Sequence, residues 1–225
     1  MTSSGFSFMS SLIDFKYNMV YSCNRRTVSI RINDDNSITV RCPTGTSLQT
    51  VEKFLCENQS WIRRKIHANI AIINDFKDVI AMKKILVAGN LYDLKICACN
   101  KIEEDVVYIK SISSLKSLYV NMFGRAFMSR FKDLANRNCF NYNEVSFKSY
   151  KGRWGCCDEK NNIVFNYKLL MLSEDLQIAV IAHELCHTVH HNHSAAFHRL
   201  LDHVCPCNRE YGKLLKHYAF VARLY

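Results

Sequence analysis

The strongest constraint on the fold comes from the stretch Ile181–His187, where His183, Glu184 and His187 stand among apolar residues. This is the His-Glu-x-x-His (HExxH) pattern. Two histidines four positions apart lie on one face of a helix, one turn above the other. Their ring nitrogens can then bind one Zn2+ ion, and the glutamate can reach a water molecule on that ion. This chemistry requires the stretch to be helical.

The surrounding residues predict a buried helix. Ser173 is suited to the N-cap, and Glu174 and Asp175 favour the positive end of the helix dipole. The helix would be apolar on nearly every side, at Leu176, Ala179, Val180, Ala182, Leu185 and Cys186. Burying ionisable groups such as these two histidines and the glutamate without a partner costs free energy of folding. A zinc site therefore accounts for them better than the alternative, in which the histidines are ordinary core or surface residues.

A third ligand is expected from His193 and from neither His190 nor His191. If the helix continued past His187, His190 would lie about 10 Å along the axis from His183. One ion that binds each imidazole at about 2 Å cannot gather rings spread over that length. We therefore expect the chain to turn after His187 and to return His193 to the metal, helped by left-handed backbone geometry at Asn192.

The eleven cysteines do not suggest a disulfide framework, because they are scattered, odd in number and mostly set in apolar segments. Residues 1–12 lack the basic start and the continuous apolar core of a signal peptide. No apolar run approaches the length of a membrane span. We therefore expect reduced thiols in a cytoplasmic protein that is not secreted and makes no membrane contact.

The chain is basic, with 30 lysines and arginines against 20 acidic residues and a formal charge of +10. Such a surface can attract nucleic acid. The basic residues are dispersed, however, and clusters such as Arg63–Lys65 are short, so a solvated surface explains them more simply. The alternative is a weak association with nucleic acid through this basic surface.

Periodicity and turn residues predict an α+β fold in which a β-rich lobe precedes a helical lobe. Residues 1–13 are expected to form a flexible tail, 14–110 the β-rich lobe and 111–225 the helical lobe. The first lobe would hold hairpins at 27–41 and 85–96, a helix from Ser47 to Ile66 and a strand at 106–109. The second would hold helices at 114–136, 195–204 and 208–223, and strands at 145–150 and 161–169.

An ordered set of motifs resembles the YgjP-like metallopeptidases, relatives of the SprT-like and WLM zinc peptidases. The set consists of Arg153-Trp154-Gly155-Cys156-Cys157, the strand 161–169, His183-Glu184-Leu185-Cys186-His187, Asn192-His193-Ser194 and Phe197. The Arg26–Pro43 hairpin and Trp61-Ile62 resemble the family's N-terminal region. Two positions depart from the family pattern, since Cys156 replaces a usual serine and His198 a usual tryptophan.

The resemblance implies a zincin-like catalytic lobe in which His183, His187 and His193 bind Zn2+ and Glu184 is the general base. Three neutral imidazoles leave one zinc position open, as catalytic sites do. The substrate would be a peptide or protein, bound in extended form along the strand that carries Ile163, Phe165 and Tyr167.

Several points stay open at the level of the sequence. Arg153 could hold a substrate carbonyl or carboxylate, whereas Trp154 is expected to anchor its loop to the core. Candidate donors to an oxyanion are Arg153, Tyr167, Tyr211 and His217. The alternative function is a nucleic-acid- or protein-binding module with a structural or vestigial zinc site.

Overall fold

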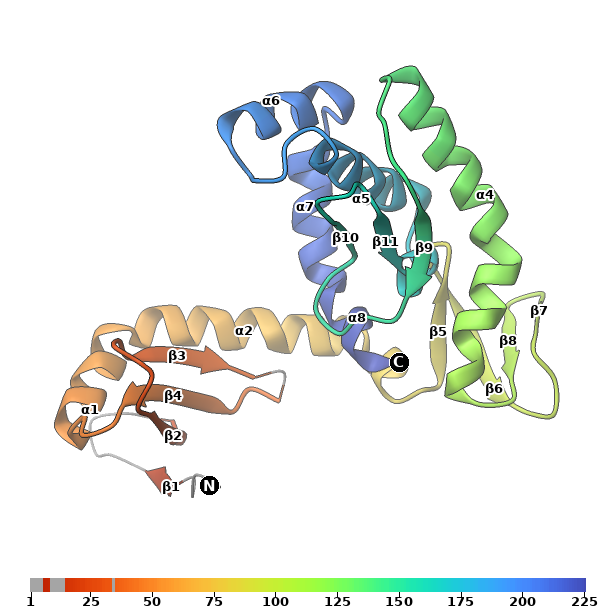
Figure 1. The fold of residues 1–225 in the computed structure, drawn as a ribbon. Coiled ribbons are helices and arrows are strands. Elements are labelled where there is room, and N and C mark those ends of the chain that lie inside the picture. The colour runs from red at the N-terminus through yellow and green to blue at the C-terminus, as the bar shows by residue number, and fades with distance from the viewer. Residues whose placement is uncertain (1–5, 9–14, 34) are drawn as a thin grey trace. The chain divides into compact units, whose positions relative to one another are not determined.

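The computed structural model describes residues 6–8, 15–33 and 35–225 (Figure 1). These residues combine helices with β-sheets, so the predicted α+β class is confirmed. Contacts divide the chain into two compact units, Met1–Lys77 and Asp78–Tyr225. Of the predicted tail, 1–13, only the short strand β1, Phe6–Phe8, falls among the described residues.

The first unit is a four-stranded sheet followed by two helices. The sheet has the order β1-β2-β4-β3, with β2 at Tyr17–Ser22, β3 at Ser29–Ile32 and β4 at Ile38–Pro43. Strands β3 and β4 form the predicted antiparallel hairpin, with Ile30 opposite Val40. Helices α1 and α2 span Leu48–Glu57 and Gln59–Asp75.

The single helix predicted from Ser47 is interrupted at Asn58. The amide of Asn58 donates to the carbonyl of Phe54, and this closes the end of α1 before α2 begins. The alternating residues of β2 and β4 and one face of each helix meet in a core. Its buried members are Tyr17, Met19, Ile38, Val40, Cys42, Val51, Leu55 and Ile62.

The second unit begins with the short helix α3, Lys77–Ile80, which starts at the division, and a sheet with the strand order β5-β6-β8-β7. The strands are β5 at Lys84–Val87, β6 at Asn90–Ile96, β7 at Lys101–Glu103 and β8 at Val106–Ile109. The hairpin predicted at 85–96 is present as β5 and β6. The inner faces of β5 and β8 pack into the core of the second unit. This sheet therefore lies in the same compact unit as the HExxH residues, whereas the sequence had placed it in the N-terminal lobe.

A glycine connects the β5–β8 sheet to the segment before the HExxH residues. Gly89, in the turn between β5 and β6, has a φ of +90°, a conformation that residues with a Cβ rarely adopt. Its N–H donates to the carbonyl of Met171 at 2.8 Å, and a Cβ at this position would lie only 3.1–3.3 Å from atoms of Ser173. The turn can approach Ser173 so closely because Gly89 has no side chain.

A second sheet of this unit has three strands in the order β10-β11-β9. They are β9 at Val145–Lys148, β10 at Gly155–Cys157 and β11 at Ile163–Asn166. Strand β11 runs parallel to β9 and antiparallel to β10. Helix α4, Leu115–Arg137, packs on this sheet, because the rings of Phe127 and Phe131 lie edge-on to Phe165 with centroids 4.9 and 5.9 Å away.

The strand predicted at 161–169 ends at Asn166, where the 3-10 helix η2, Tyr167–Met171, takes over. Helix α5, Glu174–His187, then carries the HExxH residues. Ser173 occupies the predicted N-cap position, but its side chain makes no capping hydrogen bond. Instead, the guanidinium of Arg130 in α4 donates hydrogen bonds to the side-chain oxygens of Glu174 at 2.7 Å and Gln177 at 2.8 Å, both in the first turn of α5.

The remaining helices are α6 at Ala195–Val204, α7 at Asn208–His217 and α8 at Val221–Leu224. The limits of α6 agree with the prediction. The helix predicted at 208–223 is interrupted by the 3-10 turn η3, Tyr218–Phe220. All eleven cysteines are free thiols. Within the described part of the chain, no helix has both the length and the apolar composition needed to cross a membrane.

Candidate metal centre

Three imidazole rings converge at the C-terminal end of α5. His183 and His187 project from the helix, and His193 returns to them from the segment that follows. The Nε2 atom of His183 lies 3.2 Å from Nε2 of His187 and 3.2 Å from Nε2 of His193. The ligand atoms of all three residues lie within 4.8 Å of one another. The structure therefore brings together the three histidines that the sequence singled out.

Hydrogen bonds among the rings do not explain this convergence. The Nδ1–H of His187 donates to the carbonyl of His190 at 3.0 Å, so the Nε2 of a neutral His187 carries a lone pair. Burial, together with the smaller effects of the neighbouring His187, His193 and His198, lowers the pKa of His183 to about 4. His183 is therefore neutral near pH 7 and has only one N–H for two close nitrogen neighbours.

The donor set fits a zinc ion. Zinc–nitrogen bonds of about 2.0–2.1 Å at tetrahedral angles place two ligand nitrogens about 3.3 Å apart. The two Nε2 separations from His183 in the structure, both 3.2 Å, are close to this value. The bond from His187 to a backbone carbonyl is also the usual way in which a metal-binding ring is oriented. His193 is exposed whereas the other two rings are partly buried, so the site opens to solvent on the side of His193.

The path from His187 to His193 explains why His190 and His191 do not join this cluster. Helix α5 ends at His187, and His190 is used through its backbone carbonyl. Asn192 does not adopt the predicted left-handed conformation, since its φ is not positive. Its side-chain oxygen instead accepts a hydrogen bond from the N–H of Ser194 at 3.2 Å. The turn is therefore stabilised by a side-chain hydrogen bond and not by unusual backbone geometry.

The ring of Phe197 packs against all three histidine rings. Ser194 caps α6 by accepting a hydrogen bond from the N–H of Phe197, which fixes this residue in the first turn. The fully buried Phe197 ring stacks on His187 at 4.6 Å and lies edge-on to His183 and His193 at 5.1 and 4.9 Å. The resemblance included Phe197, but the sequence did not assign it this supporting role.

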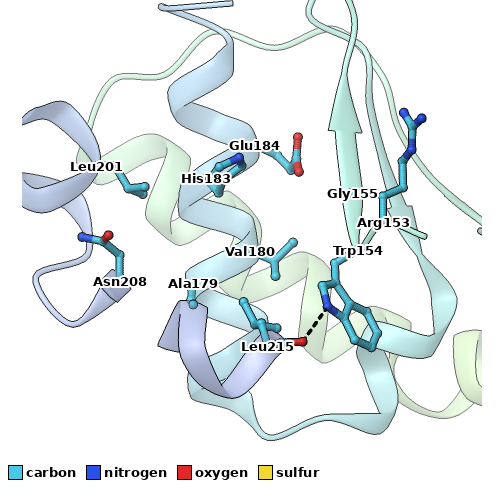
Figure 2. A pocket seen from close by; sticks show the side chains of 11 residues that line it. Arg153, Trp154, Gly155, Ala179, Val180, His183, Glu184, Leu201, Asn208 and Leu215 are labelled. Atoms are coloured by element: carbon cyan, nitrogen blue, oxygen red, sulfur yellow. Dashed lines mark hydrogen bonds between the residues drawn. The ribbon is translucent and has the colours of Figure 1, made fainter. Parts of the chain in front are cut away.

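Glu184 is placed beside the histidines as a buried carboxyl group, only 5% exposed, directed toward β10 (Figure 2). Its Oε2 atom has no hydrogen-bond partner. Burial raises the pKa of Glu184 to about 8, and the guanidinium of Arg153 acts in the opposite direction. A cation held by the three imidazoles would favour the carboxylate form. An unpaired buried acceptor next to three converging ring nitrogens is therefore a further observation that fits a metal site.

Gly155 makes room for this carboxyl group. A Cβ on Gly155 would lie 2.8 Å from both Cγ and Oε1 of Glu184 and 2.9 Å from Cδ. Such contacts are far shorter than van der Waals distances, so any larger residue would displace the glutamate. The glycine of the Arg-Trp-Gly motif and the glutamate of the HExxH motif are thus a matched pair, although 29 positions separate them in the sequence.

The family model of the YgjP-like metallopeptidase domain matches residues 26–218. The chain belongs to this family. No curated protein and no solved structure matches the chain. The match extends over most of the chain and includes strands β3 and β4 and both helices of the first unit, as well as the histidine cluster.

In this YgjP-like chain, the predicted substrate strand has to be corrected. Strand β11 is the central strand of its sheet, so β9 and β10 already occupy both of its edges. Ile163 and Phe165 are fully buried, and Tyr167 is 3% exposed. All three side chains belong to the core of the second unit. The edge strand next to the histidines is β10, and Gly155 and Cys157 line the cleft that contains His183, Glu184 and His187. Edge position depends on strand order, which the sequence had not revealed.

The Arg153-Trp154 pair divides into one exposed and one anchored residue. Arg153 is exposed, borders the same cleft and lies over the Tyr150 ring at 5.5 Å. The indole N–H of Trp154 donates to the carbonyl of Leu215 in α7 at 3.4 Å. Trp154 therefore anchors the loop, in agreement with the interpretation from sequence. The two family departures are both near the cleft: Cys156 contacts the hydroxyl of Tyr150 at 3.5 Å, and the exposed His198 lies 6.3 Å from His193, ring to ring.

Asn166 is an important residue that the sequence did not single out. It is fully buried at the end of β11. Its amide donates to the carbonyls of Tyr150 at 2.9 Å and Arg153 at 3.0 Å, and its backbone N–H donates to the carbonyl of Trp154. One side chain thus fixes the loop that carries Arg153 and leads to Gly155. The sequence around Asn166 does not reveal this role, because the hydrogen bonds join Asn166 to residues 13 and 16 positions earlier in the chain.

Asn166→Asp is expected to lower the free energy of unfolding by at least about 2 kcal/mol, because the carboxylate loses both donors and faces two carbonyl oxygens in a buried site. Urea denaturation followed by far-UV circular dichroism measures the change. The matched control is Asn141→Asp on the exposed Asn141, which should stay within about 0.5 kcal/mol of the wild type. Equal stability of the two variants would contradict the role assigned to the Asn166 amide.

Proposed function

We propose that this protein is a zinc-dependent peptidase that hydrolyses peptide bonds with Glu184 as general base. The observation that supports the proposal best is the convergence of three imidazole nitrogens beside a buried carboxylate oxygen without a partner. His183, His187 and His193 would hold the zinc ion. When bound, zinc would supply Lewis-acid activation of the attacking water and of the scissile carbonyl.

The residues of the chain have separate tasks in this scheme. Glu184 accepts the proton of the attacking water and later passes it to the leaving amine. The stack of Phe197 on His187 and the bond from His187 to the carbonyl of His190 keep the rings aligned. Arg153, exposed beside Glu184 at the border of the cleft, would bind a substrate carbonyl or carboxylate.

The substrate is proposed to be an extended peptide that pairs with the edge strand β10. This strand contacts α5, and Gly155 at its start touches the carboxyl group of Glu184. Addition of a strand to an exposed sheet edge gives main-chain hydrogen bonds to any sequence. A peptide seated there would pass along the cleft that His183, Glu184 and His187 border.

The proposal is tested by zinc analysis together with a peptide-library cleavage assay. The purified protein is expected to bind one equivalent of zinc and to cleave peptides. A chelator should abolish cleavage, and added zinc should restore it. Zinc binding without cleavage of any library peptide, combined with salt-sensitive binding of nucleic acid, would instead support a binding module with a structural metal.

Gly155→Ala tests the contact between β10 and Glu184. The added methyl group would displace the carboxyl group, and a misplacement of about 1 Å at a catalytic group costs roughly 100-fold in rate. We therefore expect kcat to fall by about that factor while the zinc content is unchanged. Gly152→Ala is the matched control, because a Cβ there would meet nothing within 4 Å. Equal activity of the two variants would show that the glutamate tolerates the displacement.

A further inference from the structure

A cavity of about 330 Å3 lies beside His183 and Glu184, on the side of α5 that faces α7 (Figure 2). Ala179 and Val180 of α5, Leu201 of α6 and Leu215 of α7 contribute apolar walls. Trp154 closes the side next to β10. The cavity shares Arg153, Gly155, His183 and Glu184 with the metal cleft, so the two spaces adjoin at the proposed reacting centre.

Away from the reacting centre, the polar side chains of the walls, Trp154 and Asn208, already have partners. The indole N–H of Trp154 donates to the carbonyl of Leu215. The amide of Asn208 donates to Asp202 and to the carbonyl of Cys205, both at 2.8 Å. A guest in the cavity would therefore gain burial against apolar side chains and few hydrogen bonds. An acidic guest would also approach the carboxyl group of Glu184, which is unfavourable.

We propose that this cavity binds the apolar side chain of a substrate residue that flanks the scissile bond. This inference rests on the proposed function and adds a substrate class to it, namely peptides with a large apolar residue such as leucine or phenylalanine at that position. The volume is at the lower end of the range of about 300–1,000 Å3 for ligand pockets, which suits one large side chain. Because the cavity begins at His183 and Glu184, the side chain that enters it belongs to a residue next to the reacting carbonyl.

Gly212 provides a way to fill the cavity without disturbing the fold. It lies within α7 and lines the cavity, and a Cβ built on it meets nothing within 4 Å. Leucine is a much better helix former than glycine, so Gly212→Leu is expected to fold. Its side chain would occupy space that the substrate side chain needs. Lys213→Leu adds the same side chain at the next, exposed position of α7 and is the matched control.

The test compares cleavage of peptides that differ only at the residues flanking the scissile bond. We expect the wild type and Lys213→Leu to prefer leucine over alanine by about 10- to 100-fold in kcat/KM at one of these positions. Gly212→Leu should lose most of this preference and still cleave the alanine peptide. Wild-type cleavage without an apolar preference, or an unchanged preference in Gly212→Leu, would overturn the inference while leaving the proposed function intact.

A binding measurement decides the inference even if no peptide is cleaved. Methyl-labelled protein is titrated with N-acetyl-leucine methylamide and followed by NMR. The methyl signals of Val180, Leu201 and Leu215 should shift in the wild type and in Lys213→Leu, and should not shift in Gly212→Leu. Absence of shifts in the wild type, or equal shifts with N-acetyl-glycine methylamide, would show that the cavity does not bind an apolar side chain.

Discussion

Glu184→Gln is expected to reduce kcat for peptide cleavage by about 100- to 10,000-fold, the range over which a general base contributes. Glutamine has nearly the same shape as glutamate and fits the space left by Gly155, but its amide cannot accept the proton of the attacking water. The zinc content should not change, because three histidines and not Glu184 form the ligand cluster. Initial rates with a cleaved library peptide and elemental analysis of the same preparation measure the two quantities.

The control for Glu184→Gln is Glu159→Gln, which removes an exposed carboxylate from the turn between β10 and β11. This variant should keep the wild-type rate. If Glu184→Gln keeps it as well, Glu184 is not the base. If Glu184→Gln loses its zinc, the carboxyl group contributes to the metal site directly, and the loss of activity no longer identifies a proton acceptor.

Local features of the fold were predictable because they depend on neighbours in the sequence. The apolar positions around Ile181 and the acidic first turn predicted the helix that ends at His187. Ser194 and Pro206 bracket α6. The spacing of His183, His187 and His193 predicted their convergence, since a helix cannot bring a third histidine to the first two and the chain has to return. The ends of both helices and the convergence of the histidines therefore depend on residues that are close in the sequence.

Features that depend on pairing between distant segments were not predictable in this way. Strand β11 looked like a substrate strand because it precedes α5, but the strand order places β10 at the edge next to the histidines. Gly155 contacts Glu184, and neither of the two sequence segments indicates by itself that they meet. The sheet formed by β5–β8 looked like part of the β-rich lobe, yet Tyr119 of α4 donates a hydrogen bond to the carbonyl of Leu86 in β5 and helps to hold it in the second unit.

His193→Ala is expected to weaken zinc binding by more than the 10- to 100-fold that loss of an outer-shell partner costs, because it removes one of three ligand atoms. The two remaining rings on α5 cannot replace it. The Nε2 atoms of His183 and His187 already lie side by side as two of the three ligand atoms. The Nδ1–H of His187 donates a hydrogen bond to the carbonyl of His190. Competition against a chromogenic chelator of known affinity measures the change, and peptidase activity should disappear at zinc concentrations that saturate the wild type.

The controls are His190→Ala and His191→Ala, which alter the two histidines nearest to His193 in the sequence. His190 supports the site through its backbone carbonyl, and alanine keeps that carbonyl in place. Neither ring belongs to the cluster of ligand atoms. Both variants should therefore bind zinc within a few-fold of the wild type. Wild-type zinc affinity in His193→Ala, or a loss in His190→Ala as large as in His193→Ala, would mean that the third ligand is not His193 and that the chain after His187 folds back differently when zinc is bound.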